Sequence, residues 1–249
     1  MKKPKINPLE NDIDTFRRIR TAIGYLGIFL PIVLIILSLI PFFGTSIQVS
    51  ISNYYYTNLR EIFTGILCAV GLFLIRYKGF RGSSFWKNDN LLTNIAGYMA
   101  FGVALFPTNP DCWNDKIYTL IPLNFKLLGF IHYGFAAVFF LILSILSINV
   151  FTIGQKENTD IPMSIFNENH IYRICGYLIL IFILLILVFS LINVTAYSTI
   201  IFEALALFSF GISWLIKGRA MGDKGEIGKK IYRENNSPDQ HKKSNSNGK

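Results

Sequence analysis

The sequence predicts an all-α membrane protein, a bundle of six transmembrane helices with both chain ends on the cytoplasmic side. Its composition, its apolar segments and the distribution of its basic residues support this fold class. Of its 249 residues, 52% are hydrophobic and 16% are charged, and the mean hydropathy is +0.43. A soluble globular chain carries roughly 25% charged residues. The composition therefore argues against an ordinary soluble enzyme.

Six apolar segments approach the length that a membrane helix needs, about 20 residues for a hydrocarbon core of about 30 Å. The second and third are short, and local thinning of the bilayer accommodates short spans. The segments are residues 21–43, 60–75, 91–106, 127–150, 174–192 and 197–216.

The first segment is uncharged and contains Pro31, which a membrane helix tolerates when neighbouring groups satisfy the freed carbonyl. A polar stretch, residues 1–20, precedes it, and it is longer than the hydrophobic region of a signal peptide. We therefore expect a retained helix behind a cytoplasmic N-terminal segment.

The later segments are delimited by polar residues. The second begins at Arg60 and Glu61 and ends before Arg76, and the fifth consists almost wholly of aliphatic residues and phenylalanine. Residues 217–249 are basic, polar and without apolar periodicity, so we expect a disordered cytoplasmic tail.

The orientation follows from the distribution of Lys and Arg residues among the loops. Residues 1–20 and every second loop after them hold 21 of the 24 Lys and Arg residues. The alternate loops hold Arg60, Lys116 and Lys126. Because Lys and Arg accumulate on the cytoplasmic side, both termini are predicted to be inside. A bacterial inner membrane is the expected location.

The net charge of +9 is explained by this topology, so nucleic acid is not an expected partner. Membrane lipids are the expected partners, and the sequence leaves open whether the protein associates with itself. The three cysteines form no CxxC pair, and the redox state of Cys112 is not readable from the sequence. Only His132 falls within an apolar segment, whereas zinc needs three or four protein ligands, so we expect no metal and no cofactor.

Three ionisable residues stand out in the apolar segments, where a central charge costs about 2.5–3.5 kcal/mol on insertion scales. They are Glu61, His132 and Glu203. Each follows the outer start of an even-numbered helix, so all three are predicted to lie in the outer half of the membrane. Each also has a structural interpretation: helix N-terminal stabilisation for Glu61, a hydrogen-bonded core imidazole for His132, and an ion pair for Glu203.

The first outer loop, residues 50–61, is rich in hydroxyl groups and leads directly into the second helix. It is interpreted either as an interfacial aromatic belt or as a lid over an outer cavity. Because consecutive helical residues point about 100° apart, Glu61 is expected to face inward and Arg60 to reach the interface.

We therefore expect a pocket open to the outer leaflet that binds a lipid headgroup or a small amphiphile. Arg60 would hold an anionic group, the carboxylates an amine or hydroxyls, and His132 would orient the ligand or shuttle a proton. The candidate ligand-binding residues are Ser52, Tyr56, Arg60, Glu61, His132 and Glu203. Two alternatives are a lipid-modifying enzyme, with His132 and a carboxylate as an acid/base pair, and a proton-coupled transporter of small solutes.

Over residues 20–216 the chain resembles DUF998-type bacterial multipass membrane proteins and, more distantly, the Frag1/DRAM/Sfk1 group. The resemblance implies a six-helix bundle, with eukaryotic relatives connected to lipid remodelling, autophagy or membrane-lipid organisation, and it implies no catalytic residue. Its motifs are an SxS-containing outer loop and an H-x-x-x-A-x-x-F-F helix, matched here by Ser50, Ser52, His132, Ala136, Phe139 and Phe140.

Overall fold

A computed structural model describes residues 8–77, 79, 82, 84–109, 119–121, 127–152, 168–192, 195 and 197–218. This part of the chain is all-helical, with no strand in it. Cys112, the greater part of the second outer loop and the C-terminal tail from residue 219 lie outside the described residues.

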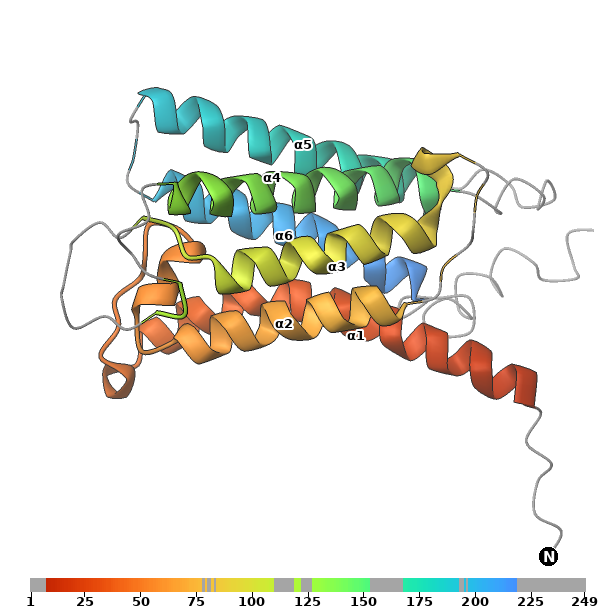
Figure 1. Cartoon of the computed structure of the whole chain (residues 1–249), viewed down its shortest axis with the longest axis horizontal. Coiled ribbons are helices and arrows are strands. Elements are labelled where there is room, and N and C mark those ends of the chain that lie inside the picture. Colours follow the sequence, from red (N-terminus) through yellow and green to blue (C-terminus); the bar gives the residue numbers. More distant parts are fainter. Residues whose placement is uncertain are drawn as a thin grey trace, which may run out of the picture.

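In the described part of the chain, six α-helices run lengthwise beside one another (Figure 1). Each helix packs against the next along the chain, and α6 also packs against α1, which closes the bundle. The helices are α1 (Pro8–Ser38), α2 (Arg60–Arg76), α3 (Asp89–Leu105), α4 (Leu128–Ile145), α5 (Glu168–Ile192) and α6 (Ser198–Lys217).

The helix boundaries differ from the apolar segments mainly at α1 and α5. The predicted first segment runs to Phe43, but α1 ends at Ser38, and a separate 3₁₀ turn covers Pro41–Phe43. Pro41 cannot continue the α-helical hydrogen bonds, and Gly44 closes the turn in the left-handed conformation, with φ of 54°. At α5 the helix begins at Glu168, before the apolar residues do. Apolar sequence marks the part that suits hydrocarbon, whereas backbone hydrogen bonding continues into polar residues.

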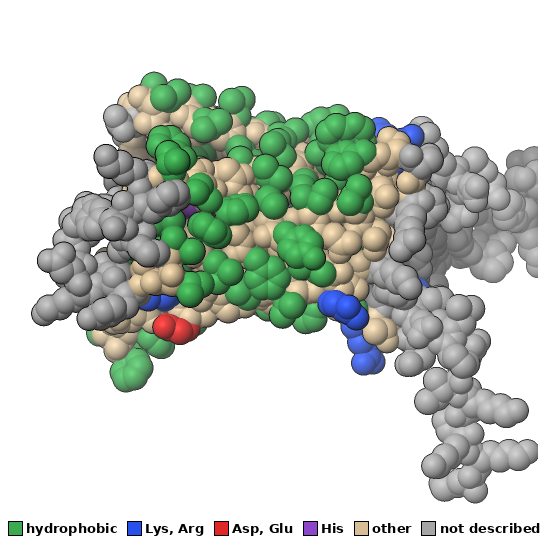
Figure 2. Space-filling model, in the orientation of Figure 1, with side chains coloured by type: hydrophobic (Ala, Val, Ile, Leu, Met, Phe, Trp, Pro, Cys, Tyr) green, Lys and Arg blue, Asp and Glu red, His purple; other side chains and the backbone are tan. Residues whose placement is uncertain are grey.

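Four helical segments are long and apolar enough to cross a membrane: Arg17–Ser38, Leu128–Val150, Asn169–Ile192 and Ser198–Lys217. The second of them includes a π-helical turn, Leu146–Val150, that extends α4. Helices α2 and α3 have 17 residues each. On the visible surface between the two ends of the bundle, apolar side chains are spread widely, with other side chains and backbone between them (Figure 2). These features indicate a multi-pass membrane protein.

The interior at one end of the bundle is built on aromatic rings. The side chain of Trp214 on α6 is fully buried, at 0% exposure. Its ring centroid lies 5.4 Å from that of Tyr77, 5.2 Å from Phe151 and 6.1 Å from Phe210. Aromatic pairs at these separations favour edge-to-face geometry and bury large areas. They therefore fix α6 against α2 and α4 at this end.

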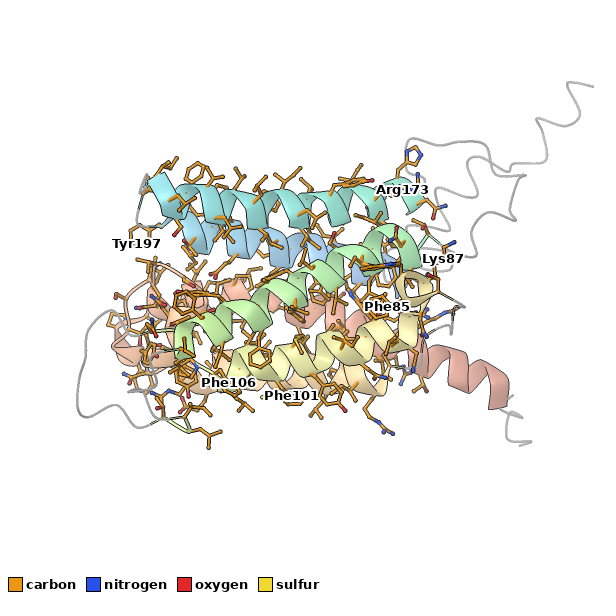
Figure 3. The ribbon with its side chains drawn as sticks, turned by 45° about the horizontal axis from the view of Figure 1, so that its top comes forward. Phe85, Lys87, Phe101, Phe106, Arg173 and Tyr197 are labelled. Atoms are coloured by element: carbon orange, nitrogen blue, oxygen red, sulfur yellow. The ribbon has the colours of Figure 1, made fainter. Side chains whose placement is uncertain are left out.

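The described basic residues are concentrated at the same end, where α1 and α5 begin and α2 and α6 finish. Figure 3 labels Lys87 and Arg173 there, with Phe106 and Tyr197 toward the opposite end. Of the eight described Lys and Arg side chains, only Arg60 belongs to the opposite end. The other seven are Arg17, Arg18, Arg20, Arg76, Lys87, Arg173 and Lys217.

Candidate functional site

The segment between α1 and α2 folds back onto the starts of other helices at the end away from the basic residues. The N–H of Ile200 in the first turn of α6 donates to the carbonyl of Val49 at 3.0 Å. A short 3₁₀ helix, Ser52–Tyr56, follows and has buried side chains at Ser52, Tyr54 and Tyr55. The expected outer loop is therefore packed into the bundle, in a position to hold polar groups against α4 and α6.

Glu203, in the second turn of α6, accepts hydrogen bonds from two donors of this segment. The N–H of Ile51 donates to Oε2 at 2.6 Å, and the hydroxyl of Ser50 lies 3.0 Å from both carboxyl oxygens. Donors directed at a carboxylate compensate part of the free energy lost when it leaves water. Glu203 is thus supported by hydrogen-bond donors, one of them a backbone group, instead of by the ion pair that the sequence left open.

His132, in the second turn of α4, is 1% exposed and makes hydrogen bonds through both ring nitrogens. Nδ1 lies 2.6 Å from the carbonyl oxygen of Phe106, and Nε2 lies 2.9 Å from Oγ of Ser52. Because a carbonyl oxygen only accepts, Nδ1 carries the proton. In the neutral imidazole Nε2 is then the acceptor for the Ser52 hydroxyl.

Residues 50–52 connect these two groups. The N–H of Ser52 donates to Oγ of Ser50 at 3.1 Å, while Ser50 donates to Glu203 and Ser52 contacts His132. Polar groups of α6 and α4 are therefore joined through one short stretch of chain. The sequence placed His132 and Glu203 at one depth, and the structure brings both to the same segment.

A cavity of about 40 Å³ adjoins this segment, between α1, α2, α3, α4 and α6. One water molecule needs roughly 10–15 Å³, so the cavity has room for more than one water-sized group. Ser52 and Glu203 contribute its polar groups, and the rest of the lining is apolar: Leu30, Ile51, Phe63, Leu67, Val103, Ala136, Phe139, Phe140 and Leu207.

Tyr56 and Arg60 hold the segments at this end of the bundle in place and do not line this cavity. The hydroxyl of Tyr56 donates to the carbonyl of Thr108. Nε of Arg60 donates to the carbonyl of Tyr55 at 2.5 Å, and its guanidinium carbon lies 4.9 Å from the centre of the Tyr55 ring. Burial raises the pKa of Tyr55 above its ordinary value, which the Arg60 charge partly opposes.

Glu61 is exposed, so the expectation that it faces inward is wrong. The buried face of α2 carries Phe63, Leu67 and Val70. Glu61 is two residues before Phe63, about 200° around the helix, and therefore points away from that face.

Sequence reasoning missed the groups that join the site together: the Ile51 N–H, the Phe106 carbonyl and the role of Ser50. The first two are backbone groups, and the residue type does not indicate which backbone groups take part in a site. Ser50 lay in the hydroxyl-rich loop, and its spacing of two from Ser52 was the one available signal. Within the described ranges, no three His, Cys, Asp or Glu residues gather as metal ligands would.

A second polar cluster lies at the basic end. Nη2 of Arg20 donates to the hydroxyl of Tyr77 at 2.7 Å, and that hydroxyl donates to Oδ2 of Asp89 at 2.9 Å. Burial, with the Asp89 charge as a second cause, raises the pKa of Tyr77 well above its ordinary value. This cluster ties α1, the end of α2 and the start of α3 together.

The fold and the polar cluster at its less basic end define an all-helical multi-pass membrane protein with a small cavity, largely apolar, that has a carboxyl group and a hydroxyl group in its wall. No protein-family model, curated protein or solved structure matches the chain. The resemblance to the DUF998-type and Frag1/DRAM/Sfk1 proteins therefore stays a prediction.

Proposed function

We propose that this protein crosses a cell membrane six times, with both ends on the cytoplasmic side, and binds a lipid headgroup or small amphiphile in a pocket near the outer leaflet. A bacterial inner membrane is the proposed location. The observation behind the binding site is the cavity whose wall combines the Glu203 carboxyl and Ser52 hydroxyl with apolar side chains.

Six spans require α2 and α3 to cross as well. A helix of 17 residues is about 26 Å long at 1.5 Å per residue, slightly short of a core of about 30 Å. Both helices lie alongside the longer ones (Figure 1), and local thinning accommodates such a difference. The concentration of described Lys and Arg at the end away from Glu203 supports a cytoplasmic position for that end.

The cavity favours a ligand with an amine or hydroxyl group joined to an apolar part. Glu203 offers oxygens to a donor, and the rings of Phe63, Phe139 and Phe140 in the wall suit a cation or a hydrocarbon. Arg60 and Tyr56 act by holding the outer segments, and Glu61 has no part in the pocket.

Lipid titration followed by native mass spectrometry tests this function. We expect phosphatidylethanolamine, which carries an ammonium group, to bind better than phosphatidylglycerol with the same acyl chains. Glu203→Gln should reduce this preference about tenfold, the lower end for a hydrogen bond to a charged group of about 1.5–3 kcal/mol. The matched control is Glu61→Gln, which removes an exposed carboxylate. Equal binding of both lipids by the unaltered protein, or an unchanged preference in Glu203→Gln, would contradict the proposal.

The alternative function is an enzyme that pairs His132 with a carboxylate, and the described contacts of His132 include no carboxylate. Both ring nitrogens of His132 are engaged, by the Phe106 carbonyl and by Ser52.

A further inference from the structure

We propose that Ser52 is a nucleophile and His132 its general base, and that the pair transfers the acyl group of an ester-bearing amphiphile to water. This inference rests on the proposed function, because the amphiphile must occupy the cavity beside Ser52.

The first support is the geometry of the pair. A serine nucleophile needs a base within about 2.6–3.2 Å, held in turn by a third group. Oγ of Ser52 is 2.9 Å from Nε2 of His132, and the Phe106 carbonyl holds Nδ1 at 2.6 Å. This arrangement makes Nε2 the nitrogen that is able to remove the hydroxyl proton. The third group is here a backbone carbonyl, which orients the ring without adding a full negative charge.

The second support is the position of the hydroxyl. His132 is 1% exposed and Ser52 is 9% exposed, so little solvent competes for the hydrogen bond between them. Ser52 is nevertheless part of the cavity wall, which gives a bound ester access to the residue. Ala136, one turn after His132 on α4, and Phe139 belong to the same wall. An ester group that enters this cavity would therefore meet an apolar wall beside the serine hydroxyl.

The third support is that the pairing is specific to Ser52. The other buried serine hydroxyls in the described ranges contact backbone carbonyls or one another. Ser209 donates to the carbonyl of Leu205 in its own helix at 2.9 Å, and Ser147 and Ser213 contact each other at 2.8 Å. Neither contact brings a serine hydroxyl to a base.

The reaction proceeds in two steps. Oγ of Ser52 forms a bond to the ester carbonyl carbon, and the carbon–oxygen bond to the alcohol breaks. The serine proton passes to Nε2 of His132 and from there to the departing alcohol oxygen. Water then attacks the Ser52 ester, giving a proton to Nε2, which returns it to Oγ as the fatty acid leaves. The sum is one ester and one water converted to one acid and one alcohol, with no oxidant or reductant.

A fluorophosphonate probe on the full chain in detergent tests the nucleophile. The Ser52 oxygen would bond to phosphorus, fluoride would leave, and the serine proton would pass to His132. We expect one adduct per chain, mapped by peptide mass to Ser52, in the unaltered protein and in the control Ser209→Ala. Ser52→Ala should give none. His132→Gln, whose amide is still able to donate to Phe106, should react at least about 100-fold more slowly.

The absence of an adduct on the folded, unaltered protein would overturn the inference. So would an adduct that maps to another residue, or an unchanged rate in His132→Gln. Mapping on the unaltered protein decides the matter even where Ser52→Ala fails to fold.

Two phosphatidylethanolamines separate this inference from the proposed function. An ester-linked lipid should bind and release fatty acid, and its ether-linked analogue should bind without turnover. Selective binding of both, with neither an adduct nor fatty acid, would overturn the inference alone. An adduct on Ser52 with no preference for ethanolamine over glycerol headgroups would overturn the ammonium site at Glu203 alone.

Discussion

The backbones of Gly24 in α1 and Gly211 in α6 meet where the two helices pack together. A Cβ atom built on Gly211 would lie 2.7 Å from the carbonyl oxygen of Gly24, and one on Gly24 would lie 2.9 Å from the carbonyl oxygen of Gly211. Real Cβ atoms do not approach a carbonyl oxygen so closely. The separation of α1 and α6 therefore depends on the missing side chains, as in small-residue contacts between membrane helices.

Gly211→Ala should destabilise the fold by about 1–3 kcal/mol, the usual range for overpacking, because a backbone carbonyl cannot move aside as a side-chain tip does. The control is Gly65→Ala in α2, where nothing lies within 4 Å of an added Cβ. Alanine there should be neutral or stabilise by up to about 1 kcal/mol through helix propensity. Denaturant titration in detergent micelles measures both, and equal stabilities would contradict the close packing.

Tyr77→Phe should lower stability at pH 8 by about 1–3 kcal/mol, since it removes the hydroxyl between Arg20 and Asp89. The pH dependence should change too. The folded pKa of Tyr77 is raised, whereas an unfolded tyrosine titrates near pH 10. Its contribution is therefore complete below about pH 10 and lost as pH rises through the raised pKa.

Thermal unfolding from pH 8 to 11 measures that slope. The unaltered protein should lose stability above about pH 10 more steeply than Tyr77→Phe does. Tyr25→Phe, which alters an exposed ring stacked on Phe29, is the control and should follow the unaltered protein. Identical slopes in all three proteins would contradict the raised pKa.

Glu203→Ala should release the Ser50–Ser52 stretch, because the Ile51 N–H and the Ser50 hydroxyl both lose their acceptor. A hydrogen bond to a charged group of about 1.5–3 kcal/mol corresponds to amide exchange about 10- to 100-fold faster at Ile51. Hydrogen–deuterium exchange measures this, with Glu61→Ala as the control on an exposed carboxylate. Unchanged exchange at Ile51 in Glu203→Ala would mean that the carboxylate does not hold the segment.

The proposed topology predicts which side of the membrane each end faces. In a cysteine-free background, Glu61→Cys should react with a membrane-impermeant maleimide in intact cells. Lys87→Cys should react only after the membrane is opened. Both positions are exposed, and they lie at opposite ends of the bundle. The reverse pattern would contradict the proposed orientation, and equal reactivity of both positions would contradict a membrane crossing by α2.

The existence of the helices was predictable because long apolar segments leave no other way to satisfy the backbone in a bilayer. The end of α1 was not predictable in this way. Leu39 and Ile40 are as apolar as the helix before them, and the break depends on Pro41. Within the site, depth alone predicted that Glu203 and His132 belong to one end. The expectation for Glu61 followed its charge, whereas the rotation of α2 follows the apolar face that carries Phe63 and Leu67.

The bridge of residues 50–52 between α6 and α4 also limits how this protein is able to move. Any rearrangement that separates those two helices at this end of the bundle must first break the hydrogen bonds of Glu203 or of His132. Residues 50–52 therefore act as a brace between α4 and α6.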